Sequence, residues 1–318
     1  MAKKRAKKKA DQNGGRSWLW YATTIISALS ALAFLVLFLF FIILLFAANV
    51  GPMGNIAVIP IQGVIVVDGQ PGLGQEITTS TKLVKLLTQA DEDTTVDAII
   101  LEINSPGGSA VASAEIADKI KTIEKPVYSV IRSTGASGAY WIASSTDKIY
   151  THRFAVTGSI GVIGSYLEFA ELLDNYNITY RRMVAGKYKD AGSPFKELSD
   201  EEAALFQKLL DDIHAGFIEE VATNRNLSTK HVRDLATGFV YLGQDAVELG
   251  LADEIGNIDK AVDDIEEKLN ITADIARYQT KTTIFEQMGI YFQEAAYNVG
   301  LGMGKNLKPQ AKGLEIIS

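Results

Sequence analysis

Residues 96–108 read VDAIILEINSPGG, so a run of apolar and β-branched residues leads directly into a Ser-Pro-Gly-Gly loop. Continuous apolar runs of this kind are typical of strands buried on both faces of a parallel sheet. The segments 56–67 and 127–131 have the same character and also predict strands. Apolar residues at helical spacing predict helices around 83–87 and 112–123. This alternation predicts an α/β domain.

Further along the chain, the sequence predicts a long helix and one more strand. Ser199 and Glu202 have the spacing of a capping box, which predicts the start of a long helix. A short apolar segment before it, Ile178–Val184, predicts one more strand. The apolar face of the predicted helix, which we expect to be structural, consists of Phe206, Leu209, Leu210, Ile213, Phe217 and Val221.

The composition excludes several classes of protein. A hydrophobic share of 47% in 318 residues is typical of a folded chain with a real core. The absence of cysteine excludes disulfides, thiolate zinc sites and a cysteine nucleophile. With only three histidines, an all-histidine metal site is not expected. We therefore expect no metal or cofactor, and a nucleophile that is an oxygen or an amine.

Charge is distributed unevenly along the chain. Residues 1–17 carry seven of the 31 basic residues and one of the 38 acidic residues, which leaves 24 basic and 37 acidic residues for the rest. Binding to nucleic acid requires a concentrated basic surface that neutralises phosphates. The acidic balance of the globular part therefore argues against a nucleic-acid partner.

The segment Ile25–Ala48 predicts a membrane anchor. It contains 24 residues, of which only Ser27 and Ser30 are polar and none is charged. At about 1.5 Å per residue, a helix of this length exceeds the ~30 Å hydrocarbon layer. The basic tail before it predicts a cytoplasmic N-terminus by the positive-inside rule, and aromatic residues suited to the interface precede it: Trp18, Trp20 and Tyr21. The alternative is a cleaved signal peptide, but the run is longer than the usual ~7–15 apolar residues.

Three clusters of glycine and serine follow predicted strands, at residues 104–108, 134–139 and 157–161. Sites of α/β proteins form in such loops, where helix N-termini present free N–H groups. Ser137 is the strongest candidate nucleophile, because its neighbours are all small and the Gly138 N–H can point at a developing oxyanion. The sequence around it lacks the second glycine of a G-x-S-x-G nucleophile elbow. The rival serines are Ser105, Ser109, Ser133, Ser144 and Ser159.

The general base is less well defined by the residues themselves. His214 and His231 lie in segments that predict packing or surface roles, whereas His152 follows a predicted strand and stays a candidate. The loop 186–195 offers lysines among small and aromatic residues. A lysine acts as a base only when it is neutral, so it must be desolvated enough to lower its pKa by several units.

The motifs together resemble a known family. Residues 103–108 (INSPGG), Ala136-Ser137-Gly138, residues 157–162 (TGSIGV) and Tyr188-Lys189-Asp190 occur in this order. The chain is similar to the short, single-domain form of signal peptide peptidase A over roughly residues 55–265. This is a family of membrane-anchored Ser/Lys endopeptidases with a ClpP/crotonase-like α/β fold of repeated β-β-α units. Ala139 and Trp141 depart from residues that are often glycine and tyrosine in the family.

The resemblance implies a role for each candidate residue. Ser137 is implied as the nucleophile and Lys189 as the general base. Ser159 is similar to the serine that orients the lysine, and the N–H groups of Gly108 and Gly138 are implied as the oxyanion hole. In double-length members of the family the lysine and the serine lie in different halves. A homo-oligomer that shares active sites between subunits is therefore expected.

These expectations define the organisation and the function of the chain. The predicted activity is cleavage of hydrophobic peptides, such as remnant signal peptides, by a single-pass protein of the cell membrane with its catalytic domain outside the cytoplasm. The alternatives are a non-proteolytic crotonase-like membrane scaffold or binding module, and a Ser-His hydrolase that uses His152. The predicted parts are a basic tail (1–17), a transmembrane anchor (18–48), a linker (49–54), a peptidase domain (55–270) and a C-terminal extension (271–318).

Overall fold

The computed structural model describes residues 14–49, 53–69, 71–72 and 75–279, so most of the predicted basic tail and of the C-terminal extension lies outside the described residues. The chain forms two compact units, Met1–Met53 and Gly54–Ser318. The first contains helix α2 (Gly14–Asn49). Within it, the 23 residues Trp20–Ile42 are long and apolar enough to cross a membrane, and no other helix of the described residues meets this criterion.

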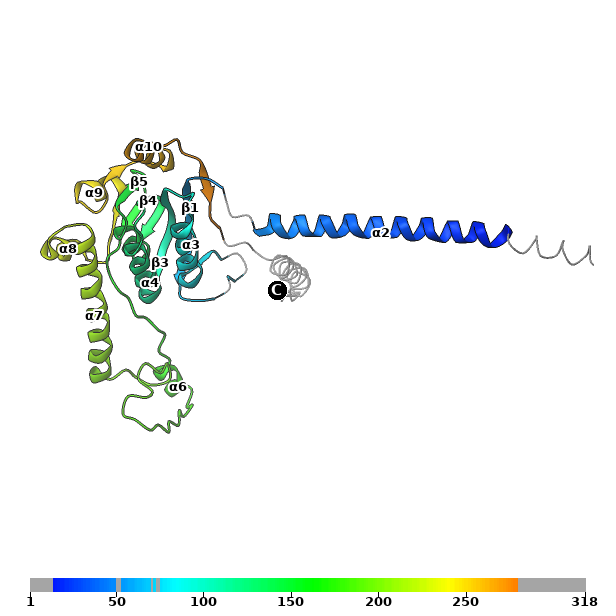
Figure 1. The fold of residues 1–318 in the computed structure, drawn as a ribbon. Helices are drawn as coiled ribbons and strands as arrows, with labels where there is room; N and C mark the ends of the chain where they lie inside the picture. Colours follow the sequence, from blue (N-terminus) through cyan, green and yellow to red (C-terminus); the bar gives the residue numbers. More distant parts are fainter. Residues whose placement is uncertain (1–13, 50–52, 70, 73–74, 280–318) are drawn as a thin grey trace, which may run out of the picture. The chain divides into compact units, whose positions relative to one another are not determined.

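The second unit is built on a parallel sheet (Figure 1). Its central strands lie in the order β2-β1-β3-β4-β5-β8, all parallel to their neighbours. Off this path, β9 pairs in parallel with β1, and β6 pairs with β4 and, in antiparallel fashion, with β7. The strand bounds are β1 Ile56–Val66, β2 Ile77–Thr79, β3 Ala98–Gly108, β4 Val127–Ala136, β5 Lys148–Thr151, β6 Val156–Gly158, β7 Val240–Leu242, β8 Glu254–Ile255 and β9 Ile275–Arg277.

Each long strand changes its pairing partway along its length. The β1–β3 register shifts between Gln62 and Val64, and the β3–β4 register shifts between Ile103 and Ser105. Strand β4 pairs with β5 in its first half and with β6 in its second half. Each long strand thus acts as two strand segments. Strands β3 and β4 lead directly into α4 and α5, whereas β1 is followed by β2 and then α3. The mixed α/β class with a parallel sheet and the β-β-α order predicted from the sequence are confirmed.

Helices cover both faces of the sheet (Figure 1). Side chains on alternate positions of β1 divide between two cores: Ala57 and Ile59 face the helices α3 and α4, whereas Ile56 and Val58 face α10. Lys148 and Tyr150 of β5 donate hydrogen bonds to Asp264 of α10, and the Lys148 ammonium holds the pKa of that carboxyl well below its usual range. The helix bounds are α3 Ser80–Glu92, α4 Ala110–Lys121, α5 Gly138–Ser144, α6 Ala170–Asn175, α7 Asp200–Asn224, α8 Thr229–Leu235, α9 Gly243–Glu248 and α10 Ile258–Leu269.

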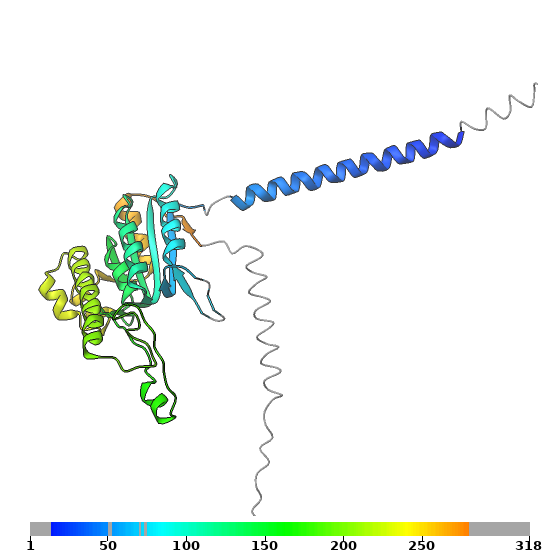
Figure 2. The same ribbon diagram turned by 90° about the horizontal axis from the view of Figure 1, so that it is seen from below.

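The segment 162–199, which we call the arm, joins β6 to α7. Figures 1 and 2 both show it extending away from the sheet. The predicted capping box is confirmed at its end, where Ser199 and Glu202 cap α7 reciprocally. The predicted strand Ile178–Val184 is wrong, because this segment is irregular and exposed and pairs with no strand of the described residues. A strand needs a neighbour to satisfy its ladder, and the arm lies beyond the sheet that would supply one.

Candidate active site

Ser137 lies on a sharp turn between β4 and α5, with φ of 53° and ψ of −126°. Residues other than glycine rarely occupy this left-handed region, and such strain persists where the surroundings impose it. Here the Ser137 N–H donates to the Gly158 carbonyl at 2.8 Å. Helix α5 therefore starts at Gly138, because Ser137 itself is not helical.

The helix that carries Ser137 at its N-terminus is firmly held in the core. All seven residues of α5 are buried. Burial raises the pKa of Tyr140, and its hydroxyl donates to the Leu251 carbonyl at 2.8 Å. The Trp141 ring stacks on Phe217 of α7 with 4.7 Å between centroids. A helix fixed on several sides can hold the strained turn in front of it.

The Ser-Pro-Gly-Gly loop at the end of β3 passes directly beside Ser137. A Cβ atom on Gly107 would lie 2.9 Å from the Ser137 Cβ, so no side chain fits there. A Cβ atom on Gly138 would lie 3.4 Å from the Gly108 nitrogen. The structure therefore brings Gly108 and Gly138, the predicted oxyanion donors, together beside Ser137. The loop is braced by Ser105, whose hydroxyl donates to the Gly63 carbonyl at 2.6 Å.

Ser159 is the neighbour of Ser137 across the sheet. Ala136 and Gly158 are partners in the β4–β6 ladder, so the two serines follow paired residues. Ser159 also has a left-handed backbone, with φ of 49°. Its N–H donates to the Phe239 carbonyl at 2.9 Å, and its hydroxyl donates to the Gly238 carbonyl at 3.1 Å.

Lys189 lies on the arm and is exposed. Within the described ranges, its ammonium forms no hydrogen bond or ion pair with Ser137 or with any other side chain. Lys187, two residues earlier, differs in this respect, because it pairs with Glu201 of α7 at 2.7 Å. One chain thus assembles Ser137, Ser159, Gly108 and Gly138, and it leaves Lys189 on a separate element.

His152 is not brought to Ser137. The backbone N–H of His152 donates to the carbonyl of Ile131 on β4 at 3.1 Å. His152 therefore lies beside Ile131, which is six positions before Ser137. At about 3.3 Å per residue this is roughly 20 Å along the strand. Its ring nitrogen accepts a hydrogen bond from Phe154 N–H at 3.3 Å. The geometry therefore gives no support to a Ser-His pair.

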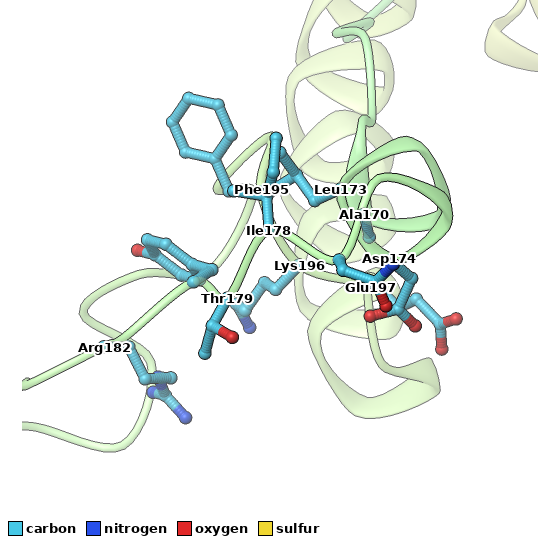
Figure 3. A pocket seen from close by; sticks show the side chains of 11 residues that line it. Ala170, Leu173, Asp174, Ile178, Thr179, Arg182, Phe195, Lys196 and Glu197 are labelled. Atoms are coloured by element: carbon cyan, nitrogen blue, oxygen red, sulfur yellow. The ribbon is translucent and has the colours of Figure 1, made fainter.

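The arm contains a cavity of about 700 Å³ that the sequence did not reveal (Figure 3). It is lined by apolar side chains, such as Leu173 and Phe195, and by charged ones. Its two cations are already paired, Arg182 with Asp190 and Lys196 with Glu202, each at 2.6 Å. No cluster of three potential metal-ligating side chains occurs among the described residues.

Comparisons with known proteins show the family to which the chain belongs. Residues 119–272 match the family model of peptidase family S49, and residues 63–170 match that of Clp protease. An Enterococcus faecium protein named "Putative signal peptide peptidase SppA" is 37% identical over 73% of this chain and 69% of its own length. A Methanocaldococcus jannaschii protein, also named a putative protease, is 32% identical over 74% of this chain and 75% of its own. "Protease 4" of Haemophilus influenzae is 34% identical over 70% of this chain and 36% of its own. The chain is therefore a serine protease that belongs to peptidase family S49, the family of signal peptide peptidase A.

Proposed function

We propose that the protein is a membrane-anchored endopeptidase in which Ser137 is the nucleophile and Lys189 the general base. The observation that carries this proposal is the strained Ser137 turn, with the Gly108 and Gly138 backbones directly beside it. Peptide hydrolysis needs a nucleophile next to donors for the developing oxyanion. The amides of Gly108 and Gly138 supply these donors.

The chemistry follows from these groups. Neutral Lys189 takes the proton of the Ser137 hydroxyl as its oxygen attacks the scissile carbonyl, and the oxyanion is held by the amides of Gly108 and Gly138. The lysine then passes the proton to the leaving amine, which leaves an acyl-enzyme on Ser137. Water, deprotonated by the same lysine, releases the acyl group and restores the serine. Ser159 orients the lysine throughout.

The lysine comes from a neighbouring copy of the chain in this proposal. The arm that carries it is highly exposed and apolar in one chain: Met183 is 96% exposed, Ile163 86% and Leu167 73%. The predicted apolar face of α7 is buried only at its C-terminal end, whereas Leu209 and Ile213 are exposed. Exposed apolar side chains that gather on one segment mark interaction sites. A head-to-tail contact between copies would cover them and desolvate Lys189, and such contacts close into rings.

Hydrophobic peptides are the proposed substrates, with remnant signal peptides as the main class. Support comes from the relative named as a signal peptide peptidase and from the apolar helix α2, which would hold the protease where such peptides are released. We place the N-terminus in the cytoplasm and residues 51–318 outside it, because seven basic residues precede the apolar helix.

This orientation predicts a protection pattern. A protease added to intact cells or right-side-out vesicles is expected to digest the catalytic domain, because it lies on the outer side of the membrane. Immunoblotting against the domain and against a tag at residue 1 measures both sides, with a cytoplasmic protein as the control for intact membranes. Full protection of the domain in such vesicles would contradict the orientation.

A serine-directed fluorophosphonate probe tests the nucleophile. We expect it to label the full chain in detergent at Ser137, because the general base activates this hydroxyl above all other serines. Peptide mapping by mass spectrometry locates the label, and the Ser137→Ala chain is the control that should stay unlabelled. Undiminished labelling of that control, or peptide cleavage by it at the native rate, would assign the activity to another residue.

A further inference from the structure

The loop 236–239, which directly follows α8, is hydrogen-bonded to Ser159 and Ile160, the residues just before the arm. These two residues lie almost 80 positions earlier in the chain than the loop. The Gly238 N–H donates to the Ile160 carbonyl at 3.1 Å, and the Ser159 N–H donates to the Phe239 carbonyl at 2.9 Å. Gly161 passes so close that a Cβ atom on it would lie 2.8 Å from the Gly238 Cα. This loop thus holds both Ser159 and the start of the arm.

The third hydrogen bond of this loop, between the Ser159 hydroxyl and Gly238, has a fixed direction. The Ser159 hydroxyl lies 3.1 Å from the Gly238 carbonyl oxygen. A carbonyl can only accept, so the hydroxyl proton must point at Gly238. The Ser159 oxygen then has only its lone pairs to offer to a further partner, and it faces that partner as an acceptor.

This direction matters for a lysine that acts as a base. A neutral amine has two N–H donors and one lone pair, and it needs the lone pair to take the proton of Ser137. A hydroxyl that donated to the amine would occupy this lone pair. A hydroxyl that accepts from an amine N–H holds the lysine and leaves the lone pair free.

Building on the proposed function, we infer that the Gly238 carbonyl is a positioning group for catalysis. It directs the Ser159 proton away from the lysine and thereby makes Ser159 an acceptor for a Lys189 N–H. No ionisable side chain in the described part of the chain hydrogen-bonds to Ser159. Ionisable residues on the neighbouring elements include Arg153 before β6, Tyr241, whose hydroxyl donates to the Leu235 carbonyl, and four residues of α8: Lys230, His231, Arg233 and Asp234. Of these, Lys230 pairs with Asp234, and the His231 Nε2 lies 3.1 Å from the Leu249 carbonyl oxygen. On the arm, Asp190 adjoins the lysine and pairs with Arg182.

Removal of the Ser159 hydroxyl is expected to shift the pH dependence of peptide cleavage in a defined direction. An acceptor stabilises the ammonium more than the amine, so removing the Ser159 hydroxyl should favour the neutral amine. In Ser159→Ala the acid limb of kcat/KM is expected to move to lower pH by about one unit, the size of a charge-assisted hydrogen bond. The kcat should fall about 10- to 100-fold through lost orientation, with KM nearly unchanged. Ser159→Gly controls for backbone strain, since glycine adopts a φ of 49° freely, and it should give the same shift.

A double-mutant cycle tests whether Gly238 acts through Ser159. Apart from its chain neighbours, no atom lies within 4 Å of a Cβ added to Gly238, so a Cβ fits there and the φ of +79° is the main constraint on a substitution. Gly238→Val should turn the carbonyl and lower kcat at least 10-fold, whereas Gly238→Asn, which tolerates this φ, should keep most activity. In the Ser159→Gly background, Gly238→Val should cost little more, because the hydroxyl it directs is gone.

The outcomes separate the inference from the function on which it rests. A limb that moves to higher pH or stays in place in Ser159→Ala overturns the inference, as does an additive double mutant in chains that assemble normally. If Lys189→Ala cleaved peptides at the native rate, the proposed dyad itself would fall. An upward shift with Lys189 dependence intact would leave the dyad standing and remove only the role of Gly238.

Discussion

Lys189→Ala is expected to lower kcat for peptide hydrolysis by about 10²- to 10⁴-fold, the usual contribution of a general base. The reason is that no histidine hydrogen-bonds to Ser137 among the described residues, and His152 is roughly 20 Å away along β4. Initial rates on a hydrophobic fluorogenic peptide, measured with the full chain in detergent, give the comparison.

Lys187→Ala is the matched control for this substitution. It removes a lysine from the same loop, but one whose ammonium is paired with Glu201 and lies over the Tyr188 ring. We expect it to retain nearly full activity. Equal losses in both variants would show that the loop, and not the base, had been damaged.

The pH profile of the wild-type chain belongs to the same prediction. The acid limb should lie above the ~6.5 of a histidine and below the ~10.4 of a free lysine, because desolvation at the assembled site favours the neutral amine. The rate therefore rises with pH as Lys189 loses its proton. A limb near 6.5 that persists in Lys189→Ala would exclude the dyad.

Two inactive chains, Ser137→Ala and Lys189→Ala, are expected to regain activity when they are co-expressed. If the site is shared between copies, an interface at which the Ser137→Ala chain supplies Lys189 and the Lys189→Ala chain supplies Ser137 contains both groups. Random mixing in a closed ring places about one quarter of the interfaces in this state. Peptide cleavage by the purified mixed assembly should approach a quarter of the wild-type rate.

The control pairs a chain carrying both substitutions with the Lys189→Ala chain, since no arrangement of these two can supply the lysine. It should stay inactive. Two different affinity tags, pulled down in succession, establish that the chains have mixed. Mixed assemblies of the two single variants that remain inactive would place the dyad within one chain.

Several features of this protein could be read from local sequence. The apolar run 98–101 is part of a buried strand because it has no polar alternation, and only a helix-covered sheet can accommodate it. The capping box at Ser199 starts α7 as predicted, since capping depends on four consecutive residues. The serine and glycine clusters are also visible in the local sequence, because small residues mark places where the backbone must approach something closely.

The tertiary structure decided the rest, because the remaining features depend on partners far away in the chain. Ile178–Val184 has the composition of a strand but lies on the arm, where no neighbouring strand completes its hydrogen bonds. Ser137 and Ser159 become neighbours through one pairing between β4 and β6, and the direction of the Ser159 hydroxyl is set by the Gly238 carbonyl, 79 residues further on. A local pattern specifies which residues can form a strand, a cap or a tight turn. Only the packed chain specifies which of them meet, since a long-range contact is fixed by the combined packing of all the elements between them.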